Sequence, residues 1–149
     1  MKNLHSYDER AAIMYDATMA LNLMTGHGKS GGDWGVHGLG HILSLLYGTP
    51  HGASLSILFP AWMKHFKPQI GVQIAKLGKD LFGASDADTT IQLFEDFFKL
   101  IGSPVRLSEF GIGDEKIEQA IQLMIRNKVS GNTLMMKEAD YKNILAFAK

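Results

Sequence analysis

Apolar residues recur along most of the chain at intervals of three and four, which is the period of an amphipathic helix. This pattern predicts helices over residues 7–24, 34–47, 52–66, 69–81, 88–101, 114–125 and 137–148. No segment alternates apolar and polar residues as a half-buried strand would. The sequence therefore predicts an all-α fold of about seven helices.

Polar residues, glycine and proline mark where several of these helices begin, end or bend. Ser6 and Glu9 have the spacing of a capping box, and Asp33 stands where the N-cap of the next helix belongs. Gly48 follows that helix at the position that favours glycine. Pro60 lies inside a predicted helix and should kink it, because proline lacks a backbone donor and clashes with the preceding turn.

The size and charge of the chain limit its class. Its 149 residues, 46% of them hydrophobic, suffice for one domain, 1–149, with a sizeable core. We expect Phe94, Phe97, Phe98 and Ile101 in that core because they recur at helical spacing. Lys plus Arg and Asp plus Glu each number 15, so the formal net charge is zero and nothing indicates a nucleic-acid partner.

The chain contains no cysteine, which excludes a disulfide framework and any cysteine-ligated zinc site. Its longest apolar run, residues 57–63, is far shorter than the ~20 residues of a membrane span. The N-terminus lacks the apolar segment of a signal peptide. These features predict a cytoplasmic protein with no membrane partner.

Three histidines, His37, His41 and His51, fall within fifteen residues. His37 and His41 are four apart and share one face of a helix. His51 follows a Gly-Thr-Pro turn that lets the chain fold back toward the other two. Neutral imidazole is a common ligand for zinc and iron, so the residues alone leave two possibilities open: a metal site built from these side chains, or three structural histidines. His5, His27 and His65 appear in no such pattern.

Departures from two known motifs argue against a metalloprotease site and a phosphate-binding loop. The spacing of His37 and His41 is that of a zinc metalloprotease, but Gly38 stands where the protease needs a glutamate. Gly28-Lys29-Ser30 lacks the earlier glycine and the preceding strand of a phosphate-binding loop, so we expect a flexible connection there. Asp33 also has ligand spacing from His37, although its position favours an N-cap role. Gly38 and Gly40 inside a helix indicate close approach by a neighbouring helix, a cofactor or a substrate.

The stretch His37-Gly-Leu-Gly-His41, Tyr47-Gly-Thr-Pro-His51-Gly52 and Leu58-Phe59-Pro60 closely resembles the iron-containing (group III) alcohol dehydrogenases. Residues 7–22, 31–37 and 102–107 are similar to the butanol dehydrogenase-like branch of that family. The resemblance implies the multi-helix C-terminal domain of the dehydroquinate synthase-like fold. The N-terminal α/β domain, which binds NAD(P) in the family, has no counterpart in this chain.

The resemblance also implies roles for the histidines. In the family an Asp and three His hold Fe²⁺ or Zn²⁺, and His37 and His51 match the third and fourth ligands. His41 matches a residue that lies beside the nicotinamide and the substrate, which moves it from metal ligand to a catalytic and cofactor-binding role. The other two ligands belong to a part of the family's sequence that this chain lacks.

The resemblance implies hydride transfer between a small alcohol or aldehyde and NAD(P). We expect that this chain alone does not catalyse that reaction. The surface that meets the missing part should be apolar, which predicts a homo-oligomer or a complementing chain. The alternative is a non-catalytic helical binding or oligomerisation module from a truncated or split gene.

Overall fold

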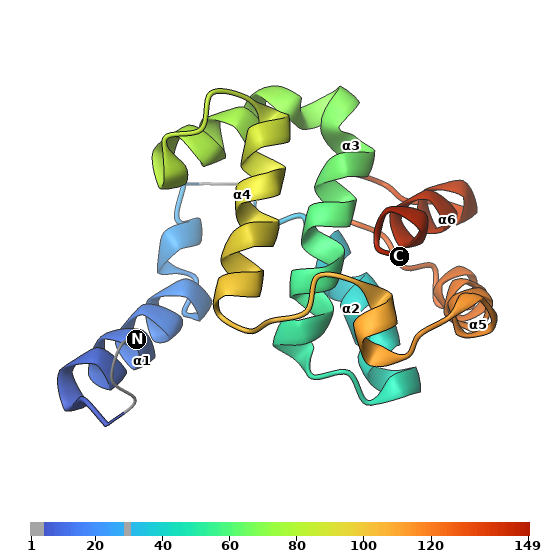
Figure 1. Cartoon of the computed structure of the whole chain (residues 1–149). Coiled ribbons are helices and arrows are strands. Elements are labelled where there is room, and N and C mark those ends of the chain that lie inside the picture. The colour runs from blue at the N-terminus through green and yellow to red at the C-terminus, as the bar shows by residue number, and fades with distance from the viewer. Residues whose placement is uncertain (1–4, 29–30) are drawn as a thin grey trace. The chain divides into compact units, whose positions relative to one another are not determined.

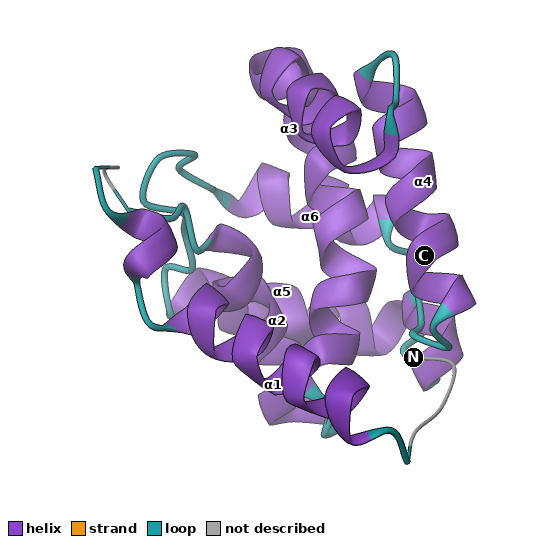
Figure 2. Ribbon diagram, turned by 90° about the vertical axis from the view of Figure 1, so that its left-hand side faces the viewer, coloured by secondary structure: helices purple, strands orange, loops and turns teal. Residues whose placement is uncertain are grey.

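The computed structural model describes residues 5–28 and 31–149, and every regular element in these ranges is a helix (Figure 2). The α-helices are α1 (Tyr7–Leu21), α2 (Gly35–Tyr47), α3 (His51–Phe82), α4 (Ala87–Leu100), α5 (Asp114–Arg126) and α6 (Glu138–Phe147). Two 3₁₀ turns, η1 (Met24–Gly26) and η2 (Leu107–Phe110), lie between them. The all-α prediction is confirmed, with one helix fewer than expected because α3 joins two predicted segments. No helix in the described ranges has the length and apolar character needed to cross a membrane.

The chain divides into two compact units, residues 1–32 and residues 33–149. In the first, Ser6 caps α1 by accepting a hydrogen bond from the backbone N–H of Glu9 at 3.4 Å, as the sequence predicted. Lys29 and Ser30 of the predicted flexible connection lie outside the described residues. A single domain over 1–149 stays a prediction.

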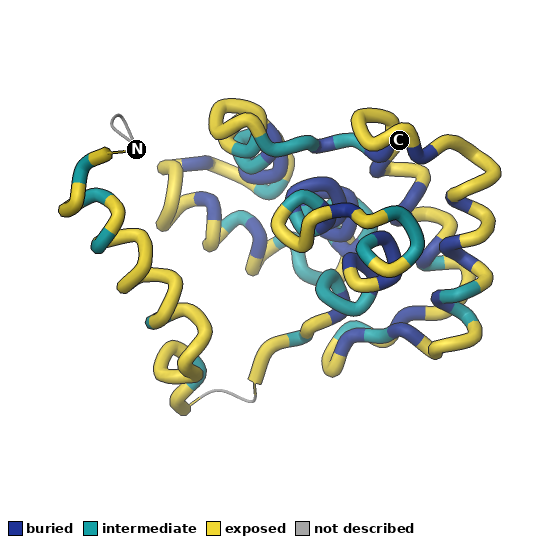
Figure 3. The backbone as a smooth tube through the Cα atoms, turned by 90° about the horizontal axis from the view of Figure 1, so that it is seen from below, coloured by how far each residue is buried: buried dark blue, intermediate teal, exposed yellow. Residues whose placement is uncertain are grey.

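Helix α3 is the central element of the second unit. It packs against α2, α4 and α6, while α5 packs against α2 and α6 (Figure 1). The buried residues gather on the inward faces of these helices (Figure 3). The fully enclosed core side chains include Leu39, Leu43, Leu58, Phe66, Met124, Ile144 and Leu145. Apolar burial of this kind contributes roughly 25 cal/mol per Å², so α3 and its neighbours hold the unit together.

Backbone angles along α3 leave the helical region at Ile70, with φ −125° and ψ 20°, two residues after Pro68. The predicted kink at Pro60 is therefore misplaced, since the buried Pro60 sits in continuous helix. Beyond the break, Gly78 lets α4 approach closely. A Cβ at Gly78 would meet Oγ1 of the fully buried Thr90 at 1.8 Å.

Helix α4 buries a polar face that its apolar pattern does not predict. Its buried residues are Thr90, Ile91 and Glu95, whereas Phe97 and Ile101 are exposed, which contradicts their expected place in the core. The packing of α4 across the second half of α3 selects the Thr90–Gly78 face instead of the aromatic one. Phe94 packs at the edge of the core.

Glu95 is held by two cations. Its carboxylate accepts hydrogen bonds from Lys64 Nζ at 2.6 Å and from both terminal nitrogens of Arg106 at 3.0 and 3.1 Å. Burial acts to raise the pKa of the Glu95 carboxyl, but the hydrogen bonds and charges of Arg106 and Lys64 outweigh it and lower the pKa. This ion pair network ties α3 and α4 to the segment before η2.

His65 is also a structural residue. It lies within α3, away from the helix ends, and its Nε2 is 2.8 Å from Oδ1 of Asp140 in α6. The ring stands edge-on to Phe66 with centroids 4.6 Å apart. The pairing links two packed helices and accounts for a histidine that had no role in the sequence pattern.

Candidate metal centre

His37, His41 and His51 come together in the second unit. The first two lie on one face of α2, and His51 is the first residue of α3. Ring centroids are 5.2 Å apart for His37 and His51, 5.1 Å for His41 and His51, and 6.4 Å for His37 and His41. One nitrogen from each ring lies within 4.8 Å of the others. The structure therefore brings together all three histidines that the sequence singled out.

A three-residue turn and one close helix contact set this arrangement. Gly48, with φ +65°, ends α2, and Pro50 caps the start of α3, so the chain reverses within 48–50. Between the two α2 histidines, Gly40 faces Ser54 of α3, and a Cβ at Gly40 would lie 2.7 Å from Ser54 Oγ. Ser54 Oγ donates to the carbonyl of His51 at 2.8 Å. The prediction that Gly40 marks close approach by a neighbouring helix is confirmed.

Gly38 serves a similar purpose on another side of α2. A Cβ there would meet Cγ1 of Val129, which follows α5, at 2.9 Å. The two glycines thus let α2 settle against α3 on one side and against the chain after α5 on the other. Their place in the helix is explained by packing within residues 33–149 and needs no bound molecule.

Asp33 accepts hydrogen bonds from backbone amides, as the N-cap interpretation predicted. Its Oδ1 accepts from the N–H of Gly35 at 3.1 Å, and its Oδ2 from those of Thr133 and Leu134 at 2.9 and 2.7 Å. The N-cap position itself is Trp34, which has a left-handed φ of 64°. The carboxylate of Asp33 therefore fixes the start of α2 to the loop before α6, and it lies outside the histidine cluster.

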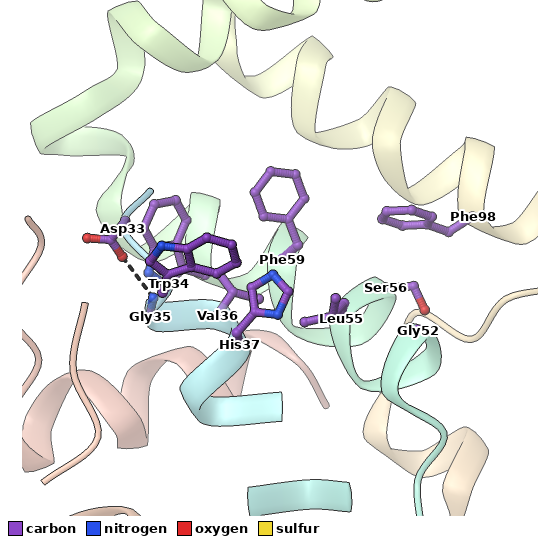
Figure 4. Close-up of a pocket in the computed structure, with 11 residues that line it drawn as sticks. Asp33, Trp34, Gly35, Val36, His37, Gly52, Leu55, Ser56, Phe59 and Phe98 are labelled. Atoms are coloured by element: carbon purple, nitrogen blue, oxygen red, sulfur yellow. Dashed lines mark hydrogen bonds between the residues drawn. The ribbon is translucent and has the colours of Figure 1, made fainter. Parts of the chain in front are cut away.

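A cavity of about 530 Å³ opens beside His37 (Figure 4). Its walls come mainly from apolar side chains of α2, α3 and α4, namely Val36, Leu55, Phe59, Trp62 and Phe98, together with Trp34. The rings of Trp34 and His37 have centroids 5.0 Å apart. The cavity can take the apolar part of a small molecule whose polar end lies near the histidines.

The sequence pattern did not indicate these cavity residues. The three-residue spacing from Trp34 to His37 could have placed the two side by side on α2. No sequence signal relates Phe98 to the site, because its position depends on how α4 packs across α3.

The surroundings of His37 favour its neutral imidazole. Burial lowers the pKa of His37 below its usual 6.5, and the nearby His51 and His41 lower it further because their charged forms would repel. Within residues 5–28 and 31–149, no hydrogen bond occupies a ring nitrogen of these three histidines. Three convergent imidazoles whose ring nitrogens have no hydrogen-bond partner in these ranges are a donor set that suits Fe²⁺, Zn²⁺ and similar divalent ions.

Comparison with known proteins finds similarity along almost the whole chain. The sequence model of the C-terminal part of the Fe-containing alcohol dehydrogenase family matches residues 1–148. A probable NADH-dependent butanol dehydrogenase 1 of Bacillus subtilis is 30% identical over 97% of this chain and 39% of its own length. NADP-dependent alcohol dehydrogenase 3 of Entamoeba histolytica is 35% identical over 97% of this chain and 37% of its own length.

Solved structures of similar proteins have the same fold as this chain over part of their length. NADH-dependent butanol dehydrogenase A from Thermotoga maritima superposes with a TM-score of 0.86 at 32% identity, covering 96% of this chain and 39% of that one. The aldehyde reductase YqhD from E. coli superposes with a TM-score of 0.92 at 24% identity, covering 99% and 41%, and this likeness concerns the fold alone. The chain thus spans about 40% of the length of the proteins that it matches.

Proposed function

Because the chain belongs to the iron-containing alcohol dehydrogenase family and matches its C-terminal part, we propose that it is the metal-binding portion of an NAD(P)-dependent dehydrogenase acting on small alcohols or aldehydes. The observation that carries the proposal is the convergence of His37 and His51 across the turn at 48–50. In the proposed arrangement both imidazoles ligate Fe²⁺ or Zn²⁺. When bound, the metal polarises the oxygen of the substrate and NAD(P) carries the hydride.

The other residues of the site have proposed roles of their own. His41, exposed beside His51, lines the space for nicotinamide and substrate and exchanges a proton there. The cavity next to His37 receives the apolar chain of the substrate, with Trp34 at its edge. The relatives' names state NADH or NADP dependence and action on butanol or other alcohols, which supports this assignment of substrate class.

The dinucleotide site and the two remaining metal ligands are proposed to come from sequence that this chain does not contain. In support, the chain matches only 37–39% of the length of two relatives whose names include the cofactor. The end of α4 exposes Phe97, Leu100 and Ile101, which are 43%, 84% and 59% accessible. A homo-oligomer or a complementing chain that covers these residues fits the proposal, in a cytoplasmic setting.

Elemental analysis tests the metal proposal. Purified protein should carry near-stoichiometric iron or zinc, and His51→Ala prepared in parallel should lose it. Protein without metal even after incubation with Fe²⁺ or Zn²⁺ would refute the proposal and leave a non-catalytic helical module. A chimera in which this chain replaces the matching part of the Bacillus subtilis relative tests the activity, since it restores the missing sequence. Aldehyde reduction by the chimera, lost in its His51→Ala form, is the expected result.

A further inference from the structure

We infer that the cavity beside His37 binds an aromatic ring, so that the alcohol or aldehyde taken by this site is an aryl compound of the benzyl alcohol type. The inference rests on the proposed function for the alcohol or aldehyde group. It adds the chemical class of the part of the molecule that the cavity holds.

The polar groups of the lining favour an uncharged ligand. Among the described residues that line the cavity, Asp33 is the one with a permanent charge, and its carboxylate already accepts three backbone hydrogen bonds. Ser56 is buried, and its hydroxyl donates to the carbonyl of Pro104 at 2.6 Å. Burying a charge without a partner is costly, so carboxylates, phosphates and amines are disfavoured. A hydroxyl or carbonyl group can lie against His37 instead.

The apolar walls of the cavity are rich in aromatic rings, which are those of Trp34, Phe59, Trp62 and Phe98. Figure 4 shows the rings of Trp34 and Phe98 well apart, with His37 and Phe59 between them. In the described part of the chain, the ring contacts of Phe98 are with Phe94 and Phe97 and not with Trp34 or Phe59. The space between these walls is therefore open to the face or the edge of a ligand ring.

Neighbouring rings hold the walls in place. Phe94 stands edge-on to Phe59 with centroids 5.3 Å apart, and Trp62 lies nearly parallel to Phe59 at 6.3 Å. Phe94 also lies 6.1 Å from Phe98. Walls that are ordered before binding reduce the entropy lost on binding. A rigid aryl group reduces it further, because it has fewer rotatable bonds to immobilise than an alkyl chain.

The size of the cavity also suits a ring. Its volume of about 530 Å³ lies within the roughly 300–1,000 Å³ of small-molecule pockets, and a benzyl group fills more of it than a butyl chain does. Each ring–ring contact adds about 2- to 10-fold in affinity beyond the burial of apolar area. The cavity therefore favours a benzyl group over a butyl chain and over a saturated ring of similar size.

The test compares the binding of benzyl alcohol with that of cyclohexylmethanol, its saturated counterpart, to metal-free protein. Trp34 and Trp62 are the two tryptophans of the chain and both line the cavity, so their indole N–H signals in ¹H–¹⁵N spectra report binding. Burial of apolar area alone favours cyclohexylmethanol, which is the more hydrophobic of the two. We expect benzyl alcohol to bind about 2- to 10-fold more tightly instead.

Two neighbouring phenylalanines provide a variant and its matched control. Phe98→Leu removes a ring from the wall but keeps an apolar side chain, whereas Phe97 is exposed and is not among the lining residues. The preference for benzyl alcohol should fall by about 2-fold or more in Phe98→Leu and keep its wild-type value in Phe97→Leu. An unchanged preference in Phe98→Leu overturns the inference.

The wild-type comparison needs no variant, no metal and no NAD(P), so its outcome is separate from that of the proposed function. If the protein binds metal but takes cyclohexylmethanol as tightly as benzyl alcohol, the inference is wrong and the proposed function stands. If it binds no metal yet prefers benzyl alcohol, the proposed function fails and the cavity is still a site for aryl groups. If neither alcohol shifts the indole signals, the inference is wrong whatever the metal content.

Discussion

Replacing Gly40 by alanine should destabilise the protein, and its partner Ser54 should decide the sign of the effect. The new Cβ would lie 2.7 Å from Ser54 Oγ but 3.5 Å from Ser54 Cβ, so the hydroxyl alone is in conflict. The cheapest relief is rotation of Ser54, which is 0% exposed and would lose its hydrogen bond to His51. An unmade buried hydrogen bond costs roughly 1–3 kcal/mol, and alanine regains about 0.5–1 kcal/mol over glycine in a helix. The net loss is about 1 kcal/mol.

A double-mutant cycle with Ser54→Ala tests whether the Ser54 hydroxyl causes the destabilisation. Without the hydroxyl, the remaining contacts, 3.4 Å to Leu55 Cδ2 and 3.5 Å to Ser54 Cβ, are ordinary, so Gly40→Ala should then stabilise by about 0.5–1 kcal/mol. Gly71→Ala in α3, whose nearest neighbour would be Lys67 Cγ at 3.7 Å, is the control and should stabilise by about the same amount. Urea unfolding followed by circular dichroism measures each difference. Stabilisation by Gly40→Ala with Ser54 present, or equal destabilisation without it, would show the packing argument to be wrong.

The same variants connect packing to the proposed metal site. Gly40 stands between His37 and His41, and Ser54 is one turn after His51, so a shift at this contact moves the three histidines relative to one another. Zn²⁺ affinity should fall in Gly40→Ala and return in Gly40→Ala/Ser54→Ala. A fall that persists in the double variant would mean that α2 is displaced by something other than the hydroxyl.

Three further predictions concern charge and polar contacts. Glu95→Gln should cost about 2–3 kcal/mol at pH 7, because hydrogen bonds to charged groups contribute about 1.5–3 kcal/mol and the carboxylate joins two cations. Since the pKa of Glu95 is lowered in the folded protein, this stabilisation is present above the pKa of the unfolded chain, about 4.3, and is lost as pH falls through the folded pKa. In urea unfolding, the difference in free energy between the two proteins should therefore be smaller at pH 3 than at pH 7. Asp33→Ala should cost about 2–4 kcal/mol, because three backbone N–H groups lose their acceptor. Asp33→Asn should cost clearly less, because its amide oxygen still accepts. Equal losses of stability in thermal melts would refute the role of the Asp33 carboxylate as acceptor. Because the pKa of His37 is lowered in the folded protein, the unfolded chain binds a proton on this imidazole at a higher pH than the folded one. Metal-free protein should therefore lose stability as pH falls below about 6.5. His37→Gln should flatten that part of the profile of melting temperature against pH.

Sequence patterns predicted the helices because the apolar periodicity and the cap residues act locally. Ser6 accepts from the backbone N–H of Glu9 at 3.4 Å and caps α1, and Gly48 ends α2, both as predicted. Errors arose where tertiary contacts decide. The face of α4 that is buried depends on Gly78, a residue of another helix, which the sequence of α4 does not contain.

The candidate site was predictable to a similar extent. The i, i+4 spacing and the short turn were enough to expect His37, His41 and His51 near one another. Their relative distances were not, since these follow from how closely α2 and α3 approach at Gly40. Local sequence fixes which residues can meet, and packing between helices fixes how near they come.

The histidine cluster is positioned by contacts within the protein. The turn at 48–50, the contact of Gly40 with Ser54 and the bonds of Asp33 orient α2 through interactions inside residues 33–149. Small zinc domains differ, because their binding energy is largely consumed in folding the chain. Here several contacts within residues 33–149 hold the backbone around the three histidines. Under the proposed function, a chain that spans 39% of a relative's length keeps a donor set ready to bind, and the remaining sequence is needed for the chemistry.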